Sequence, residues 1–231
     1  MTMSTSTVIN GDCLEAMKTM ADNSFDLAIV DPPFGVNYAR GKNGWGVCDN
    51  RPTLSDVKWD TKPENTYWTE LFRVSANQII WGGNYFTDIL PVSKSWIIWD
   101  KNGDTENKSV FGDAELAWTS FNKVIRRFTL RQMGFITDTK DKIRVHPCQK
   151  PIELYEFLLT NYAKPGDRIL DTHLGSGSSR IACYDLGFDF VGYELDRDYY
   201  EAQEKRFAKH LEQPNMFAPV VASAEQLAIN F

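Results

Sequence analysis

Residues 168–195, "RILDTHLGSGSSRIACYDLGFDFVGYEL", restrict the fold of this chain more than any other stretch. An apolar run is followed by a glycine-rich turn, a helical segment that ends at Gly187, and a second apolar run. This order predicts two parallel strands, because a helix of this length is the usual crossover between strands that run in the same direction. The chain is therefore expected to contain a βαβ unit.

Short apolar runs and helical segments alternate along the rest of the chain as well. We expect further strands within residues 6–12, 25–31, 77–83, 95–101 and 113–120. We expect further helices over residues 13–20, 152–163 and 197–213. Such alternation is typical of an α/β protein with a mostly parallel sheet. At 231 residues, with 42% hydrophobic and 24% charged residues, the chain is predicted to be a single globular domain over 1–231.

Composition also argues against several classes of protein. No apolar run approaches the length of a membrane span and no signal pattern begins the chain, so we expect a cytoplasmic protein without a membrane partner. The four cysteines are scattered and form no C-x-x-C pair, which indicates neither a metal site nor a disulfide framework. A net charge of −6 disfavours nonspecific coating of nucleic acid but permits a local basic surface.

The glycine turn can hold a polar ligand close to the backbone. Gly175 and Gly177 have no side chains, so backbone amides at the start of the helix are accessible. Glu194 ends the next strand, where a carboxylate can accept hydrogen bonds from both hydroxyls of a ribose. Arg180 stands where a dinucleotide fingerprint has Gly or Ala, which disfavours NAD. The pattern favours a nucleoside-type cofactor without a pyrophosphate.

A second unusual stretch is "DLAIVDPPFGVNY", residues 26–38. Asp31 is expected at the carboxyl end of a buried strand, the edge at which open parallel sheets bind ligands. Pro32 and Pro33 donate no backbone N–H, so the turn offers mainly hydrogen-bond acceptors, and Phe34 adds a flat apolar face. Acceptors beside a ring suit the exocyclic amino group of a base. Hydrogen bonds from that amine to Asp31 and to the Pro32 carbonyl would favour its attack on an electrophilic methyl group.

Three motifs together resemble those of the S-adenosylmethionine-dependent DNA amino-methyltransferases, which modify adenine N6 or cytosine N4. "DPPF" is similar to their catalytic tetrapeptide. "DTHLGSGSS" is similar to their cofactor loop, with Thr172 and His173 in place of the usual Pro-Phe. "HPCQKPIEL", residues 146–154, resembles their H-P-x-Q-K-P element. The order of the motifs resembles the beta class, a circular permutation of the common methyltransferase fold.

The resemblance implies a fold, an activity and a set of partners. The implied fold is a Rossmann-like, seven-stranded, mostly parallel sheet with one reversed strand. The implied reaction moves a methyl group from S-adenosyl-L-methionine to a base in double-stranded DNA. A homodimer, a restriction endonuclease partner and a bacterial or bacteriophage source also fit this class.

The resemblance also assigns roles to individual residues. Catalysis falls to Asp31, Pro32, Pro33 and Phe34. The H-P-x-Q-K-P element is expected to wall the methionine end of the cofactor, and Asp12 is expected to contact the adenine. The complete set expected around the cofactor is Asp12, Cys13, His146, Gln149, Lys150, Asp171, Gly175, Ser176, Gly177 and Glu194. "PCQ" at 147–149 also matches the nucleophile of cytosine-C5 methyltransferases, but Cys148 precedes the cofactor loop here, so we expect no covalent role for it.

Two segments are candidates for contact with DNA, since a base must be flipped out of the duplex to reach Asp31. Residues 122–150 carry eight Lys or Arg side chains and two Asp side chains, a net charge of +6 that fits phosphate contacts. Within it, a short target-recognition region is expected at about 122–145, with contacts from Lys123, Arg126, Arg127 and Arg131. The polar loop at 37–65 mixes aromatic and basic residues, and its expected DNA contacts are Tyr38, Arg40 and Lys42.

Within the family that the chain resembles, an initial Asp rather than Ser in the tetrapeptide favours adenine, so the predicted function is N6-adenine methylation of DNA. Cytosine N4 methylation is the nearest alternative. Methylation of RNA or of a protein glutamine, and a non-catalytic nucleic-acid-binding protein of the same fold, are further alternatives.

Overall fold

Among the residues that the structure describes, the central sheet has eight strands. A computed structural model describes residues 4–35, 61–103, 112–133, 136–141 and 143–212. The strand order is β1-β10-β9-β2-β3-β5-β4-β6. In that order the bounds are Ser6–Asn10, Asp189–Glu194, Arg168–Asp171, Phe25–Val30, Ser75–Trp81, Ala114–Thr119, Trp96–Asp100 and Arg126–Thr129. The strands are parallel except β5, which is antiparallel to both β3 and β4. The Rossmann-like sheet with one reversed strand is thus confirmed.

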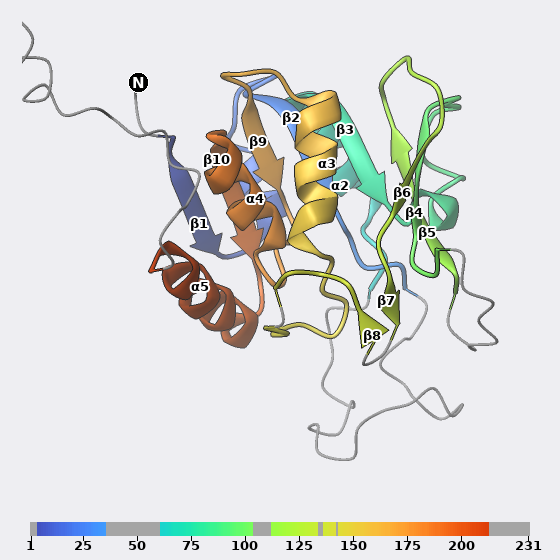
Figure 1. Ribbon diagram of the computed structural model, residues 1–231. Coiled ribbons are helices and arrows are strands. Elements are labelled where there is room, and N and C mark those ends of the chain that lie inside the picture. Colours follow the sequence, from blue (N-terminus) through green and yellow to red (C-terminus); the bar gives the residue numbers. More distant parts are fainter. Residues whose placement is uncertain (1–3, 36–60, 104–111, 134–135, 142, 213–231) are drawn as a thin grey trace, which may run out of the picture.

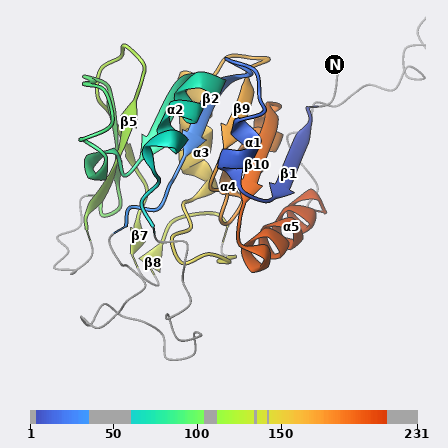
Figure 2. The same cartoon turned by 180° about the vertical axis from the view of Figure 1, so that it is seen from behind.

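Helices cover both faces of this sheet (Figures 1 and 2). On one face lie α3 (Ile152–Tyr162) and α4 (Ser178–Leu186), and on the other α1 (Cys13–Met17) and α2 (Asn65–Val74) with the short helix η2 (Gly83–Tyr85). Successive side chains of strand β2 point to opposite faces of the sheet, and both faces are apolar. Leu27 and Ile29 pack toward α3, and Ala28 and Val30 pack toward α2. Helix α5 (Arg197–Leu211) lies against α4 and β10.

Parallel strands bring their carboxyl ends to one edge, which we call the catalytic edge. Asp12, Glu194, Asp171 and Asp31 stand at or just beyond the ends of β1, β10, β9 and β2, four adjacent strands. Because β5 runs in the opposite direction, its beginning rather than its end reaches this edge, and Glu115 comes with it. The topology thus gathers acidic side chains that are as much as 182 positions apart in the chain (Asp12 and Glu194).

The structure adds elements that the sequence pattern did not predict. Strand β6 lies in the 122–145 region, where the sequence pattern predicted no strand, and in the described part of the chain it makes the sheet eight-stranded rather than seven-stranded. Its residues pair with β4 alone and two of its four are arginines, so it lacks the apolar pattern of a central strand. A small hairpin of β7 (Gln132–Met133) and β8 (Ile136–Thr137) follows it.

Helix α2 is the other addition. It runs into β3 without a turn, since Ser75 is both its C-cap and the first residue of that strand, so no Gly or Pro marks its end. Most of the loop expected at 37–65, with Tyr38, Arg40 and Lys42, and the tail after Pro214 lie outside the described residues. In the described part of the chain, no helix is both long and apolar enough to cross a membrane.

Candidate active site

Asp31 is the charged centre of the catalytic edge. It directly follows β2, and its side chain is 19% exposed. Its Oδ2 atom pairs with the Lys150 ammonium, whereas its buried Oδ1 has no hydrogen-bond partner among the described residues. Burial raises the pKa of Asp31 above its ordinary value, against the opposing effect of Lys150. One oxygen of this carboxylate is thus held by the protein, and the other remains a strong acceptor.

Lys150 also pairs with a second carboxylate. Its Nζ lies 3.2 Å from Glu115 Oε2, and Glu115 Oε1 lies 2.9 Å from Lys101 Nζ. Burial by itself lowers the pKa of Lys150, but Asp31 and Glu115 outweigh it and raise that pKa well above the ordinary value. Burial raises the pKa of Glu115, but Lys150 and Lys101 outweigh it and lower that pKa to about 2. Charges therefore alternate in sign along one line from Asp31 to Lys101.

The residues after Asp31 form an aromatic surface. Pro32 is buried, Pro33 is half-buried, and the Phe34 ring is stacked on Tyr85 with centroids 4.8 Å apart and planes 15° apart. Gly82, with φ of 67°, makes room for the ring: a Cβ atom there would lie 2.0 Å from Phe34. Neither Gly82 nor Tyr85 was expected at this site. The Gly-Gly pair after β3 is a turn signal that could have indicated a close approach of another group to the backbone.

The glycine turn between β9 and α4 is held to the end of β10. The Gly175 N–H donates to Glu194 Oε2 at 2.7 Å, and the Asp196 N–H donates to Glu194 Oε1 at 2.9 Å. Gly177, the N-cap of α4, has φ of 77°, and a Cβ atom there would come within 3.2 Å of Gln203. The turn thus depends on glycine both for its left-handed backbone and for the close approach of α5.

Asp171 and the two residues after it lie beneath this turn. Asp171 is 1% exposed, accepts from the Ser179 hydroxyl at 2.5 Å and from the His173 N–H at 3.0 Å, and burial raises its pKa to about 7. Thr172 shares a hydrogen bond of 2.7 Å with the Tyr67 hydroxyl. Burial lowers the pKa of His173 to about 4, and its ring packs edge-on against Tyr67. The departure from the usual motif is therefore accommodated by Tyr67 of α2.

Arg180, which argued against a dinucleotide, points away from this turn. Its guanidinium pairs with Glu204 at 2.8 Å and lies 3.8 Å from the centroid of the Phe207 ring, both on α5. The side chain is a structural link between α4 and α5.

Residues 146–151 connect the glycine turn to Asp31. The His146 ring lies beside Gly175 and 4.4 Å from the Tyr199 ring, and burial lowers its pKa to about 4. The Lys150 carbonyl accepts from the Ser178 hydroxyl at 2.7 Å, while the Lys150 ammonium reaches Asp31. This one residue touches both the start of α4 and the Asp31 carboxylate.

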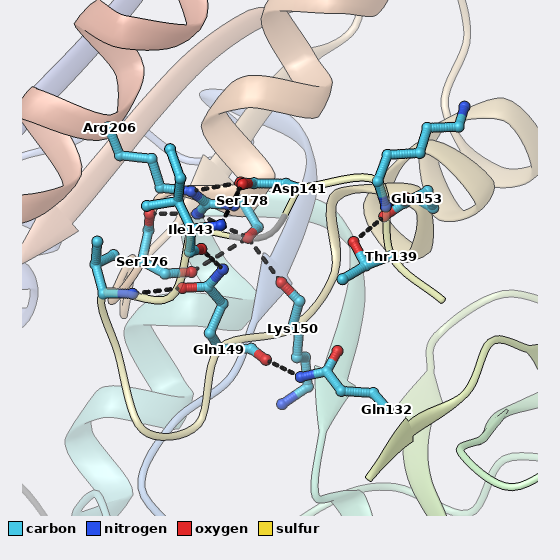
Figure 3. A network of polar contacts seen from close by, with 12 residues as sticks. Gln132, Thr139, Asp141, Ile143, Gln149, Lys150, Glu153, Ser176, Ser178 and Arg206 are labelled. Carbon is cyan, nitrogen blue, oxygen red and sulfur yellow. Dashed lines mark hydrogen bonds and ion pairs between the residues drawn. The ribbon is translucent and has the colours of Figure 1, made fainter. Parts of the chain in front are cut away.

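A network of polar contacts holds these segments together (Figure 3). Arg206, 3% exposed, donates to the Ser176 carbonyl at 2.6 Å and pairs with Asp141 at 2.6 Å. The Gln149 side-chain amide donates to the Ile143 carbonyl at 2.7 Å, and the Gln149 backbone carbonyl accepts from the Gln132 side-chain amide at 2.8 Å. The region between β6 and α3 is thereby fixed to the same turn that forms the other wall of the site.

The remaining cofactor candidates are at the end of β1. Asp12 is exposed and caps α1, accepting from the Leu14 N–H at 2.8 Å. Burial raises the pKa of Cys13 to about 12, so its thiol stays neutral. Desolvation and the Asp31 carboxylate raise the pKa of Cys148 to about 11, which is the opposite of an activated nucleophile.

The basic residues expected to contact DNA do not form one surface. Arg126 begins β6, at the edge of the sheet opposite the catalytic edge, whereas Arg131 follows the end of that strand. Lys123 donates to the Asn161 carbonyl at 2.5 Å near the end of α3. Arg131 pairs with Asp138 at 3.0 Å and Arg127 lies 3.7 Å from Asp100. A role in DNA binding stays a prediction for all four.

This fold and this cluster of residues define the Rossmann-like methyltransferase class, and solved structures are similar to the chain throughout. The putative DNA modification methylase TTHA0409 of Thermus thermophilus, complexed with S-adenosyl-L-methionine, has a TM-score of 0.58 at 17% identity and covers 90% of this chain and 95% of its own. The M1.HpyAVI–SAM complex has a TM-score of 0.54 at 24% identity, covering 87% and 98%. The PvuII DNA methyltransferase, described as cytosine-N4-specific, has a TM-score of 0.59 at 13% identity, covering 92% and 89%.

Sequence comparison agrees with the structural matches. The model of the N6/N4 family, described as "DNA methylase", matches residues 91–205. The type II methyltransferase M.HinfI of Haemophilus influenzae is 25% identical, with 90% of this chain and 70% of that protein aligned. The putative methylase YubD of Escherichia coli K12 is 24% identical, with 87% and 89% aligned. The family match, the relatives and the solved structures together support an S-adenosylmethionine-dependent N6/N4 DNA methyltransferase.

Proposed function

We propose that this chain transfers a methyl group from S-adenosyl-L-methionine to the N6 amino group of an adenine flipped out of double-stranded DNA. One observation carries the proposal. Asp31, with a buried oxygen that has no described partner, is connected through the single residue Lys150 to the glycine turn at the start of α4. The amine-binding group and the cofactor turn thus belong to one site.

The residues around the turn fit a nucleoside-type cofactor. Glu194 and Asp12 follow neighbouring strands, β10 and β1, and can accept hydrogen bonds from the ribose and the adenine. Gly175 is half-buried and has no side chain, and the His146 ring forms the wall beside it, whereas Ser176 and Gly177 are buried within the turn. Arg180 is engaged with α5 and is not available to a 2′-phosphate or pyrophosphate. When bound, S-adenosyl-L-methionine supplies an electrophilic methyl group.

The residues near β2 fit the chemistry of an aromatic amine. Asp31 Oδ1 and the Pro32 carbonyl accept the two amine hydrogens, which localises the nitrogen lone pair and stabilises the positive charge that develops on nitrogen. The methylated nitrogen then loses one proton. Asp31 already accepts one amine hydrogen and is therefore the base in this proposal. Burial raises the pKa of Asp31, which makes it a better base. Phe34 and the exposed ring of Tyr85 provide flat surfaces for the flipped base.

The proposal is tested by chemical analysis of the product. Unmethylated duplex DNA is incubated with the protein and the labelled cofactor, digested to nucleosides and analysed by mass spectrometry. We expect N6-methyladenosine as the labelled product. N4-methylcytosine would move the proposal to the alternative base within the same family. Label in RNA or protein, or no transfer to DNA of varied sequence, would contradict it.

A further inference from the structure

Glu115 is a half-buried charge that the mechanism above does not use. It comes from β5, the reversed strand, whose first residues lie at the catalytic edge. Its side chain is 31% exposed, and its Oε2 lies 3.2 Å from the Lys150 ammonium, which is itself 4% exposed and paired with Asp31. Two carboxylates from different strands therefore share one buried ammonium group.

The charges of these groups affect how well the site can stabilise a positive charge on a substrate. Asp31 and Lys150 alone are neutral together, so they would do little to stabilise a positive charge developing on a substrate amine. With Glu115 the three groups carry a net charge of −1. Lys101 pairs with the oxygen of Glu115 that does not face Lys150, so the four charges together sum to zero. The negative end of this row of charges is Asp31 and the positive end is Lys101.

We propose that Glu115 is a positioning residue for methyl transfer: as a second carboxylate beside the Lys150 ammonium it offsets part of that positive charge, so that Asp31 is a stronger acceptor for the substrate amine. The inference rests on the proposed function, because it assigns the amine to Asp31. It concerns a residue outside the three sequence motifs.

The arrangement also predicts how Glu115 affects the pKa of Asp31. The groups that act on or respond to this carboxylate electrostatically come from several elements: Lys150, Glu115, Asp171, Cys148 and Tyr155. Of these, Glu115 raises the pKa of Asp31 and Lys150 lowers it. Removing the charge of Glu115 leaves Lys150 to Asp31 alone, so the pKa of Asp31 should fall.

The test compares Glu115→Gln with two other variants. Glu115→Asp keeps the charge and should restore much of the function. Glu204→Gln is the matched control, because Glu204 also pairs with a buried cation, Arg180, and is 38% exposed, but lies on α5 away from Asp31. For Glu115→Gln we expect turnover to fall by at least about tenfold, with the KM values for cofactor and DNA within about threefold of the parent.

The second measurement needs no turnover. The carboxyl carbon of Asp31 is followed by NMR as pH is varied, in the protein without DNA. We expect its pKa to fall in Glu115→Gln and to stay at the parent value in Glu204→Gln. Unchanged titration of Asp31 in Glu115→Gln, or equal loss of turnover in Glu204→Gln, would overturn the proposal. Absence of DNA methylation by the parent protein would instead remove the proposed function, while the titration would still decide whether Glu115 acts on Asp31.

Discussion

The two halves of the catalytic edge hold their carboxylates in different ways. On the side of β1, β10 and β9, Glu194 accepts from two backbone amides and Asp171 accepts from a hydroxyl and an amide. On the side of β2 and β5, Asp31 and Glu115 share the Lys150 ammonium. Backbone donors hold a carboxylate in place without adding a charge, whereas an ammonium group also offsets the negative charge of the carboxylate. In the proposed function the first half, called the binding half below, holds the cofactor and the second, called the reaction half, carries the reaction.

The largest effect should come from the reaction half, at Asp31. In Asp31→Ala we expect methyl transfer to fall by at least about 10²–10³-fold, because the developing positive charge loses its acceptor. Cofactor affinity, measured by calorimetry, should stay near the parent value. Asp31→Asn serves as a second variant of the same shape, in case the unpaired Lys150 destabilises the alanine form. Transfer at near the parent rate in both would show that the amine binds elsewhere.

Gly82 offers a sharper test of the aromatic surface, with Gly187 as its matched control. Both have a left-handed φ, of 67° and 76°, so replacement by alanine costs each about 1 kcal/mol of backbone strain. A Cβ atom at Gly82 would overlap Phe34, whereas at Gly187 it would meet nothing within 4 Å. Turnover in Gly82→Ala should fall by as much as about 100-fold and in Gly187→Ala stay near the parent value. Equal turnover in the two variants would mean that the position of Phe34 does not matter.

The binding half should respond in affinity instead of turnover. In Glu194→Gln we expect the Kd for the cofactor to rise by at least about tenfold, since a charged acceptor is lost, while turnover at saturating cofactor is kept. Glu201→Gln, which removes an exposed pair with Arg197, is the control and should change neither quantity. A fall in saturated turnover without a change in Kd would reverse the assignment of roles to the two halves.

The smallest effect on function is expected at His173, where the change should appear in stability. Burial lowers the pKa of His173 to about 4, so the unfolded chain takes up a proton between pH 6.5 and 4 that the folded chain does not. Folding stability therefore decreases as pH falls through this window. His173→Phe keeps a ring beside Tyr67 and removes the titration. Between pH 7 and pH 5, urea unfolding should show the parent losing roughly 2 kcal/mol more than the variant. Parallel losses would indicate that His173 is protonated in the folded protein.

The sequence predicted the binding half better than the reaction half, and the reason is physical. Gly175, Gly177 and Glu194 belong to one continuous strand–turn–helix–strand pattern, so their proximity follows from local rules. Asp31 could be placed at a strand end for the same reason. Glu115 and Lys150 meet through a reversed strand and a separate loop, and no local pattern encodes such a pairing.

The basic region shows a different limit. A count of charges over residues 122–150 cannot reveal which of them are already engaged. The structure pairs Arg131 with Asp138, directs Lys123 to the end of α3 and buries Lys150 against Asp31. Helix α2 was missed because it joins β3 without a turn, and with it the Tyr67 hydroxyl that supports Thr172.

Lys150 contacts both halves of the site. Its backbone carbonyl accepts a hydrogen bond from Ser178, and its side-chain ammonium pairs with Asp31. In the proposed function, the length of the Lys150 side chain therefore sets the spacing between the donor and the acceptor of the methyl group. A shorter cation at this position could satisfy one attachment or the other, and the two ligands would no longer be held at a common spacing.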